Sequence, residues 1–158
     1  MRLAVDANTL LSGLFFDGKE RCLLLASLRG SVRLVVAEDT LEEVYDVVAK
    51  VFSDHQDLPS ALDLLEEILD AGEVVRRRHY ARNVASWAKR LRDPTDAPLL
   101  ACAVAVGVDG VVSGDKDVIE SQDLGGIRAY RTREVLERLG EHDREKKSVH
   151  RLTTQKKP

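Results

Sequence analysis

Acidic side chains stand where two buried strands of this sequence are expected to end. Asp6 follows the apolar run Leu3-Ala4-Val5, and Asp115 follows shortly after the strand expected over residues 108–112. In an open parallel sheet, the carboxyl ends of the strands lie at one edge, and ligands bind there. We therefore expect Asp6 and Asp115 to be close neighbours although they are far apart in the chain.

A third acidic residue, Asp96, is expected at the same edge. Residues 93–96 read Asp-Pro-Thr-Asp, a pattern typical of a helix start, and residues 97–106 are apolar on nearly all sides. The helix over 97–106 is therefore buried and runs antiparallel to the strand that follows it. Its N-terminal end then lies at the carboxyl edge of the sheet, where the positive end of the helix favours a carboxylate.

The fourth candidate lies on the amphipathic helix expected over residues 38–52. At 100° per residue, Glu43 falls beside Val47 at the margin of the apolar face, whereas Glu42 points to the solvated face with Asp46. We therefore choose Glu43 as the carboxylate that points inward.

Four carboxylates that converge on one site repel one another, and their pKa values rise until some protonate. A divalent cation removes this repulsion, and oxygen ligands without Cys or His favour Mg²⁺ or Mn²⁺ over zinc. Such an ion can hold a phosphate and make a bound water nucleophilic. The sequence therefore predicts metal-dependent phosphodiester hydrolysis, in which Asp6, Asp96 and Asp115 hold the metal and Glu43 positions a metal or the attacking water.

Each acidic residue also has a purely structural interpretation. Asp6 could end a strand in a turn, Asp96 could belong to a capping box with Asp93, and Asp115 could lie in a polar turn after Gly114. Glu43 taken alone is most simply a solvated helix residue. The functional interpretation is favoured because independent caps and turns need not all face one edge of a sheet.

Strand and helix patterns alternate along the chain, which is typical of a parallel sheet covered by helices on both faces. Asn8 is the expected N-cap of the first helix. The expected strands span residues 2–6, 32–36, 73–78, 108–112 and 127–130, and the expected helices span 9–16, 19–28, 38–52, 60–71, 80–92, 97–106 and 132–139.

The composition is that of one soluble domain. The chain has 158 residues, of which 44% are hydrophobic and 32% charged, and two cysteines without metal-ligand spacing. It has no run long enough to span a membrane and no signal-peptide pattern, so we expect a cytoplasmic protein with no membrane partner. With a net charge of −3, nucleic-acid binding would need a local basic patch or bound cations.

The acidic residues and their neighbours resemble the PIN domain, the metal-dependent nuclease fold of VapC-like toxins, including its putative toxin-component subgroup. The resemblance covers about the first 139 residues. It rests on four segments that occur in the family's order: Val5-Asp6-Ala7-Asn8, Leu41-Glu42-Glu43-Val44, Asp96-Ala97-Pro98-Leu99-Leu100-Ala101 and Ser113-Gly114-Asp115-Lys116-Asp117.

The resemblance implies a three-layer α/β/α sandwich with a central, mainly parallel sheet, which we expect to span residues 1–140. Residues 141–158 have few apolar side chains and no counterpart in the family, and we expect them to form a flexible charged tail. It implies cleavage of single-stranded RNA with Mg²⁺ or Mn²⁺, a homodimer, and a partner antitoxin. The roles it implies fall on two sets of residues: an acidic quartet of Asp6, Glu43, Asp96 and Asp115, and auxiliary positions at Asp117, at Asn8, which would hold the Asp6 carboxylate, and at Ser113, where the family usually has Thr.

A basic segment spans residues 76–92, and its part over 79–92 is longer and more basic than the loop that the family usually has there. We expect Arg76, Arg77, Arg78 and Arg82 to contact RNA phosphates. The alternative is a solvated helix face, with Trp87 as an anchor in the core.

Two other functions are weighed against the ribonuclease. A phosphatase of the haloacid-dehalogenase kind also begins with a strand that ends in Asp, but it needs an acid two residues later, where this chain has Asn8. A PIN module that binds RNA or a partner without cleavage belongs to another class, and the complete acidic set argues against it.

Overall fold

Five parallel strands form one sheet, with the order β3-β2-β1-β4-β5, in the computed structural model, which describes residues 1–121 and 124–140. The strands are β1 (Arg2–Val5), β2 (Arg33–Ala37), β3 (Glu73–Val75), β4 (Gly110–Val112) and β5 (Arg128–Tyr130). β1 lies at the centre, and Val5 is in register with Val112 of β4. The two strands therefore end side by side, which places the residues that follow them next to each other.

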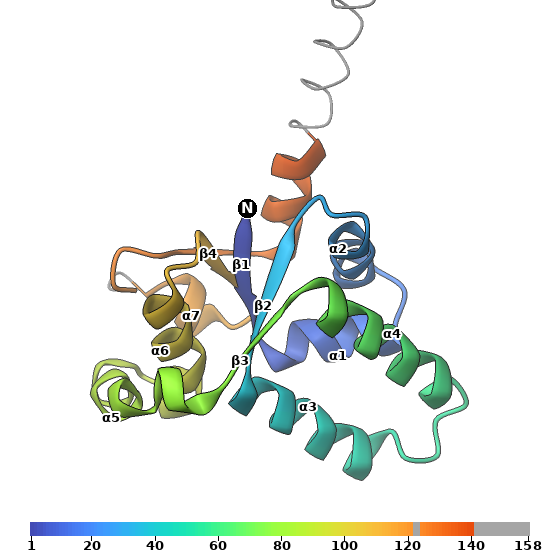
Figure 1. The fold of residues 1–158 in the computed structure, drawn as a ribbon, viewed down its shortest axis with the longest axis horizontal. Coiled ribbons are helices and arrows are strands. Elements are labelled where there is room, and N and C mark those ends of the chain that lie inside the picture. Colours follow the sequence, from blue (N-terminus) through green and yellow to red (C-terminus); the bar gives the residue numbers. More distant parts are fainter. Residues whose placement is uncertain (122–123, 141–158) are drawn as a thin grey trace, which may run out of the picture.

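Helices cover both faces of the sheet (Figure 1). One layer contains α1 (Ala7–Phe15), α2 (Lys19–Leu28), α3 (Glu38–Val51), α4 (Leu58–Ala71) and a helix over residues 132–140. The other contains α5 (Ala81–Arg90), α6 (Ala97–Val106) and the short α7 (Lys116–Ile119), with 3₁₀ turns at η1 (Arg77–His79) and η2 (Pro94–Asp96). The predicted three-layer sandwich with a parallel sheet is confirmed.

Two hydrophobic cores, one on each face, follow from the alternation of side chains along the strands. On β1, Leu3 and Val5 belong to the core beneath α1 to α4, whereas Ala4 belongs to the core beneath α5 to α7. β1 is apolar on both faces because it is covered on both faces. The expected tail over 141–158 lies outside the described residues, so its flexibility and the domain boundary at residue 140 stay predictions.

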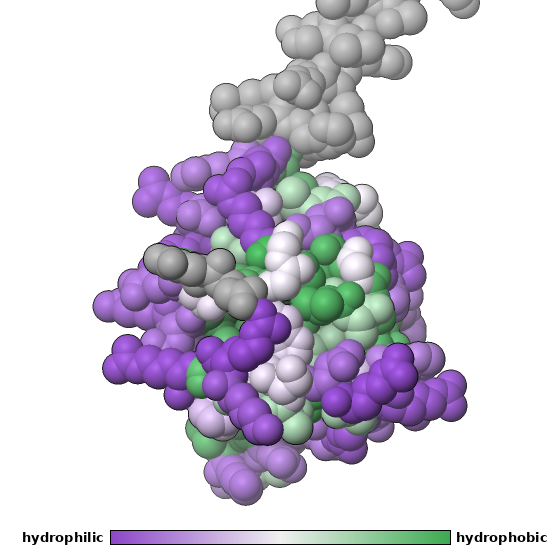
Figure 2. Space-filling model, turned by 90° about the vertical axis from the view of Figure 1, so that its left-hand side faces the viewer, coloured by the Kyte–Doolittle hydropathy of each residue, from purple (hydrophilic) through white to green (hydrophobic). Residues whose placement is uncertain are grey.

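The layer of α5 to α7 is built around α6, whose residues from Ala97 to Ala103 are buried except for Pro98. Gly107, with φ of 63°, ends the helix in the left-handed conformation that Gly adopts readily. Figure 2 views this side of the molecule and shows an apolar area bordered by hydrophilic side chains. Val104 of α6 is 37% exposed. No helix within the described ranges is both long and apolar enough to cross a membrane.

Three local predictions were wrong. The N-cap of α1 is Asp6, not Asn8, because the Asp6 carboxylate accepts a hydrogen bond from the backbone N–H of Thr9. β3 ends at Val75, and the chain then turns into η1 instead of continuing as a strand to Arg78. A short helix, α7, follows Asp115 where only a polar segment was expected, since the Asp115 carboxylate caps it by accepting from the N–H of Asp117.

Candidate active site

The carboxylate of Asp6 is held in place by hydrogen bonds to both of its oxygens. Oδ1 accepts from the backbone N–H of Thr9 at 2.8 Å, and Oδ2 accepts from the hydroxyl of Ser113 at 2.5 Å. These two donors occupy the role expected of Asn8, whose side chain is exposed. One donor comes from the first turn of α1 and the other from the end of β4, so the fold itself fixes the orientation of the carboxylate.

Ser113 links Asp6 to the next acidic residue of the site. The Ser113 side chain is fully buried, and while its hydroxyl donates to Asp6, its oxygen accepts from the backbone N–H of Asp115 at 3.0 Å. Asp115 in turn caps α7 through the N–H of Asp117. The chain after β4 is therefore held in a fixed path that presents the Asp115 carboxylate at the carboxyl edge of the sheet.

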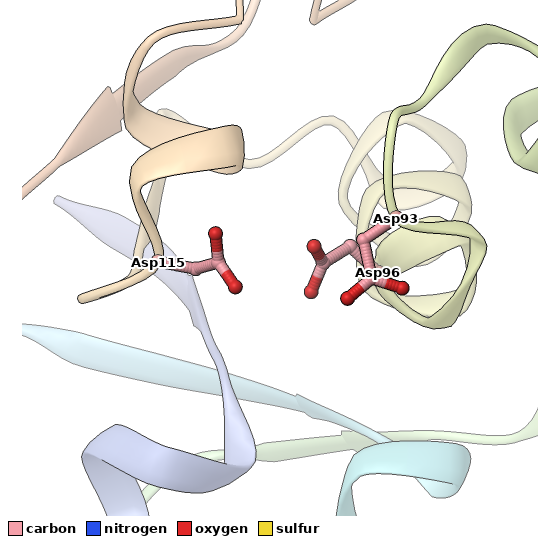
Figure 3. Close-up of side chains that lie close together, drawn as sticks. All are labelled: Asp93, Asp96 and Asp115. Carbon is pink, nitrogen blue, oxygen red and sulfur yellow. The ribbon is translucent and has the colours of Figure 1, made fainter.

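A cluster of three carboxylates forms across this edge. Asp93, Asp96 and Asp115 each offer a carboxylate oxygen, and these oxygens all lie within 4.8 Å of one another. Figure 3 shows Asp115, from the start of α7, facing Asp93 and Asp96, which precede α6. Carboxylate oxygens at this spacing can share one cation, and hard cations such as Mg²⁺ take oxygen ligands of this kind.

Asp93 was expected only as a helix cap, and it does cap η2: its Oδ1 accepts from both the backbone N–H and the hydroxyl of Thr95. Those two hydrogen bonds hold the pKa of Asp93 below its ordinary value. The sequence did not indicate that Asp93 belongs to the cluster. An Asp that caps a helix has the same sequence pattern whether or not its side chain also faces the end of a neighbouring strand.

The pKa of Asp96 is raised from 3.8 to about 6. Burial is the largest cause, and the charges of Asp115, Asp93, Asp6 and Asp117 follow in that order. Each of these carboxylates penalises the ionised form of Asp96 because like charges repel across a partly desolvated site. The site without a cation is therefore electrostatically unfavourable at neutral pH.

Glu43 lies with Asp6 and Asp96 around a small cavity of about 40 Å³ between α3 and the loop before α6. Burial, and then the charge of Asp6, raise the pKa of the Glu43 carboxyl above its ordinary value. Of the two adjacent glutamates on α3, Glu43 is thus the one that faces the acidic centre. Asp6, Glu43 and Asp96 line one cavity, and Asp96 also belongs to the cluster with Asp93 and Asp115.

Glu42 points elsewhere and belongs to an ion-pair network with Arg77. Arg77 Nη2 lies 2.5 Å from Glu42 Oε2 and 3.1 Å from Asp39 Oδ1, while its backbone N–H donates to Glu38. Tyr80, fully buried, donates its hydroxyl to Asp39 at 2.5 Å. Arg77 therefore fastens η1 to the first turns of α3. Its guanidinium forms these ion pairs, and the RNA contact expected of Arg77 stays a prediction.

The other expected RNA contacts differ in their surroundings. Arg76, Arg78 and Arg82 are exposed, and Arg78 Nε donates to His79 at 3.4 Å.

Trp87 is only 4% exposed and packs in the core of the α5 to α7 layer, as the structural interpretation had it. Asp117, the expected auxiliary acid, lies 3.5 Å from Arg92 and contributes its charge at Asp96.

The sequence matches the PIN domain family over residues 2–117, most of the chain, so the chain belongs to the PIN domain family. Members of this family are typically nucleases. The family resemblance of the four acidic segments is thereby confirmed. The match favours a PIN domain over the haloacid-dehalogenase-like phosphatase that was considered as an alternative. No curated protein matches the chain by sequence.

Three solved structures share the fold at low sequence identity. PAE2754 from Pyrobaculum aerophilum has a TM-score of 0.60 at 17% identity, covering 89% of this chain and 90% of that chain. FitAcB from Neisseria gonorrhoeae has a TM-score of 0.57 at 17% identity, covering 84% and 98%. VapBC2 from Rickettsia felis, solved with a DNA fragment from its promoter, has a TM-score of 0.57 at 12% identity, covering 83% and 98%. At these identities the likeness concerns the fold.

Proposed function

We propose that this chain is an endoribonuclease that hydrolyses phosphodiester bonds of single-stranded RNA with Mg²⁺ or Mn²⁺. The observation that carries the proposal is the convergence of acidic side chains at one edge of the sheet. Asp6, Glu43 and Asp96 line one cavity, and Asp96 shares a cluster with Asp93 and Asp115. A PIN domain with such a centre is equipped for metal-assisted hydrolysis of a phosphodiester.

The donor set fits a hard divalent cation. All candidate ligands are carboxylate oxygens, and within the described residues the cluster contains no Cys or His. Burial, and after it the repulsion from neighbouring carboxylates, raises the pKa of Asp96, and a bound dication would relieve the repulsion. Asp6, Asp96 and Asp115 would hold the ion, and Asp93 would be a further ligand. A bound dication would supply charge neutralisation for the scissile phosphate and a lowered pKa for the attacking water.

The chain's own residues have distinct tasks in this mechanism. The Ser113 hydroxyl and the Thr9 N–H orient both oxygens of Asp6, so no reorganisation of that ligand is needed when substrate binds. The Glu43 carboxyl, whose pKa is raised by burial and by the charge of Asp6, positions the attacking water and accepts its proton. As the water oxygen bonds to phosphorus, the bond to the leaving ribose oxygen breaks, and that oxygen takes up a proton from solvent.

A toxin role is proposed on the resemblance to VapC-like proteins together with the fold shared with VapBC2 and FitAcB. A partner antitoxin and a homodimer belong to the same proposal, as does a cytoplasmic location. The apolar area on the side of α5 to α7 (Figure 2) is one surface that association with another chain would cover. Size-exclusion chromatography with light scattering tests the homodimer, and a monomer at all concentrations would refute it.

The test of the nuclease is cleavage of single-stranded RNA oligonucleotides by the purified full-length chain with Mg²⁺ or Mn²⁺. We expect cleavage that stops in excess EDTA and in Asp6→Asn, while Asp46→Asn, on the exposed face of α3, cleaves normally. Full activity of Asp6→Asn or of the EDTA-treated protein would refute the mechanism. RNA binding without cleavage across several metals and sequences would instead favour a PIN module that only binds.

A further inference from the structure

A second, larger cavity has none of its lining residues in common with the cavity between Asp6, Glu43 and Asp96. It has a volume of about 350 Å³, within the range of roughly 300–1,000 Å³ that is typical of small-molecule sites. Its walls come from α1, the start of α2, the segment after β4 and the segment after β5. Both strands end at the carboxyl edge of the sheet, so this cavity opens on the same edge as the acidic centre.

The cavity and the acidic centre share a wall. Thr9 and Ser113 line the cavity, and these are the two residues that donate hydrogen bonds to the oxygens of Asp6. A molecule in the cavity would therefore lie against residues that are hydrogen-bonded directly to the Asp6 carboxylate. A polymer bound across Asp6 would extend into this cavity.

The charge of the cavity is opposite to that of the acidic centre. Lys19, Arg131 and Arg133 line it, against one carboxylate, that of Glu20. Lys19 and Arg131 form no side-chain ion pair with any residue of the described part of the chain, and the pair of Arg133 with Glu137 is exposed. Cationic side chains that meet from α2 and from the chain after β5, with little local neutralisation, favour an anionic ligand.

We propose that this cavity is a subsite for the RNA strand, which holds the phosphate next to the scissile one together with its nucleoside. The inference rests on the proposed function and deepens it. Lys19 and Arg131 bind the phosphate, and the exposed amide of Asn8 lies on the same wall within reach of a base or ribose. The subsite places the backbone so that its neighbouring phosphodiester lies over Asp6, which makes Lys19 and Arg131 substrate-binding residues.

The test measures RNA binding by the full-length Glu43→Gln variant, in which cleavage is blocked. Into that variant we introduce Lys19→Ala with Arg131→Ala, and as matched controls Lys50→Ala with Arg29→Ala, which are exposed at the far ends of α3 and α2. We expect the cavity pair to weaken binding about tenfold or more and to lower the salt slope by about 0.7 per lost phosphate contact. The control pair leaves both quantities unchanged. An unchanged Kd and slope in the cavity pair would overturn the subsite.

A gain of affinity provides a readout that damage to the fold cannot imitate. Glu20→Gln removes the one carboxylate of the cavity and should tighten RNA binding about threefold at low salt, with the gain lost at high salt. Tightening supports the subsite, and no change or weaker binding contradicts it. Circular dichroism and the melting temperature check that every variant is folded.

Two further outcomes separate this proposal from the nuclease proposal. If the native chain cleaves RNA and the cavity pair binds it normally, the nuclease stands and the subsite falls. If the native chain neither cleaves nor binds RNA, inorganic phosphate is tested by calorimetry. Phosphate binding that is lost in the cavity pair would show that the cavity is an anion site but not an RNA subsite. If phosphate does not bind either, the subsite is also overturned.

Discussion

Ser113 Oγ donates a hydrogen bond to Asp6 Oδ2 at 2.5 Å, although the two residues are 107 positions apart in the chain. The bond joins the ends of β1 and β4, the adjacent central strands of the sheet. The same hydroxyl accepts from the N–H of Asp115, so one buried side chain sets the positions of two acidic residues. Ser113 is thus a positioning residue for the acidic centre.

Ser113→Ala should lower the rate of RNA cleavage about 10- to 100-fold, because removal of a residue that orients a metal ligand typically costs this much. The loss should be smaller at high Mn²⁺ concentration, since the weakened cation affinity is then compensated. Ser113→Thr keeps the hydroxyl and should retain most activity. Steady-state cleavage at several metal concentrations measures both, and a fully active Ser113→Ala would contradict the role of the bond.

The adjacent glutamates of α3 make a matched pair. Glu43→Gln should lower cleavage at least about 100-fold, because it removes the group that accepts the proton of the attacking water. Glu42→Gln should leave cleavage within about twofold, since Glu42 faces Arg77 and not the acidic centre. Single-turnover cleavage measures both variants. Equal losses of activity in the two variants would contradict the inference that Glu43, and not Glu42, faces the acidic centre.

The positions of the acidic residues could be predicted from the sequence because they depend on two simple rules. Parallel strands end at one edge, which brings Asp6 next to the segment with Ser113 and Asp115, and helical periodicity separates Glu43 from Glu42. Both rules act over a few residues or over whole elements, and neither needs side-chain packing. The structure places these residues as the rules predict, while their catalytic roles stay predictions.

The surroundings of the centre were harder to predict because they depend on contacts between distant loops. The sequence shows Arg77 only as one cation in a basic run, and nothing local indicates that Glu38, Asp39 and Glu42 meet it across η1. Similarly, Arg131 lies between the strand expected over 127–130 and the helix expected over 132–139, and no local pattern distinguishes it. Applying the rule of strand ends to β5 would have placed it at the same edge as Asp6.

Arg77→Ala and Arg78→Ala should therefore affect different properties of the protein, its stability and its RNA binding respectively. Arg77→Ala should lower the melting temperature by a few degrees, because it removes the cation that both Asp39 and Glu42 pair with, and it should change the salt dependence of RNA binding little. Arg78→Ala, and likewise Arg82→Ala, should leave the melting temperature unchanged and lower the salt slope by about 0.7 if the side chain meets a phosphate. Thermal melts and fluorescence anisotropy separate the two effects. An unchanged slope for both exposed arginines would remove them from the RNA interface.

Asp96 should make the metal-free protein less stable at neutral pH than at mildly acidic pH. Its pKa is about 6 in the folded chain and 3.8 when unfolded, so the folded state binds more protons between these values, and stability rises as the pH falls. Asp96→Asn should be more stable than the native chain at pH 8 by about 1–2 kcal/mol, a shift of about two units reduced for solvent screening. The difference should vanish below about pH 4. Urea titrations in EDTA across this range measure it, and a constant difference would exclude the titration of Asp96 as its cause.

A divalent cation should stabilise the native chain, because it binds the folded cluster of Asp93, Asp96 and Asp115 and has no comparable site in the unfolded chain. At one hundred times its Kd, the gain in the free energy of unfolding is about 2.7 kcal/mol, which raises the melting temperature measurably. Asp115→Asn should abolish most of this gain. It should also raise the stability of the metal-free protein, because the charge of Asp115 has a larger effect on Asp96 than that of any other carboxylate. Asp46→Asn, on the exposed face of α3, should respond to Mg²⁺ and Mn²⁺ as the native chain does. Melts with and without each cation test the set, and an equal response from Asp115→Asn and the native chain would place the cation elsewhere.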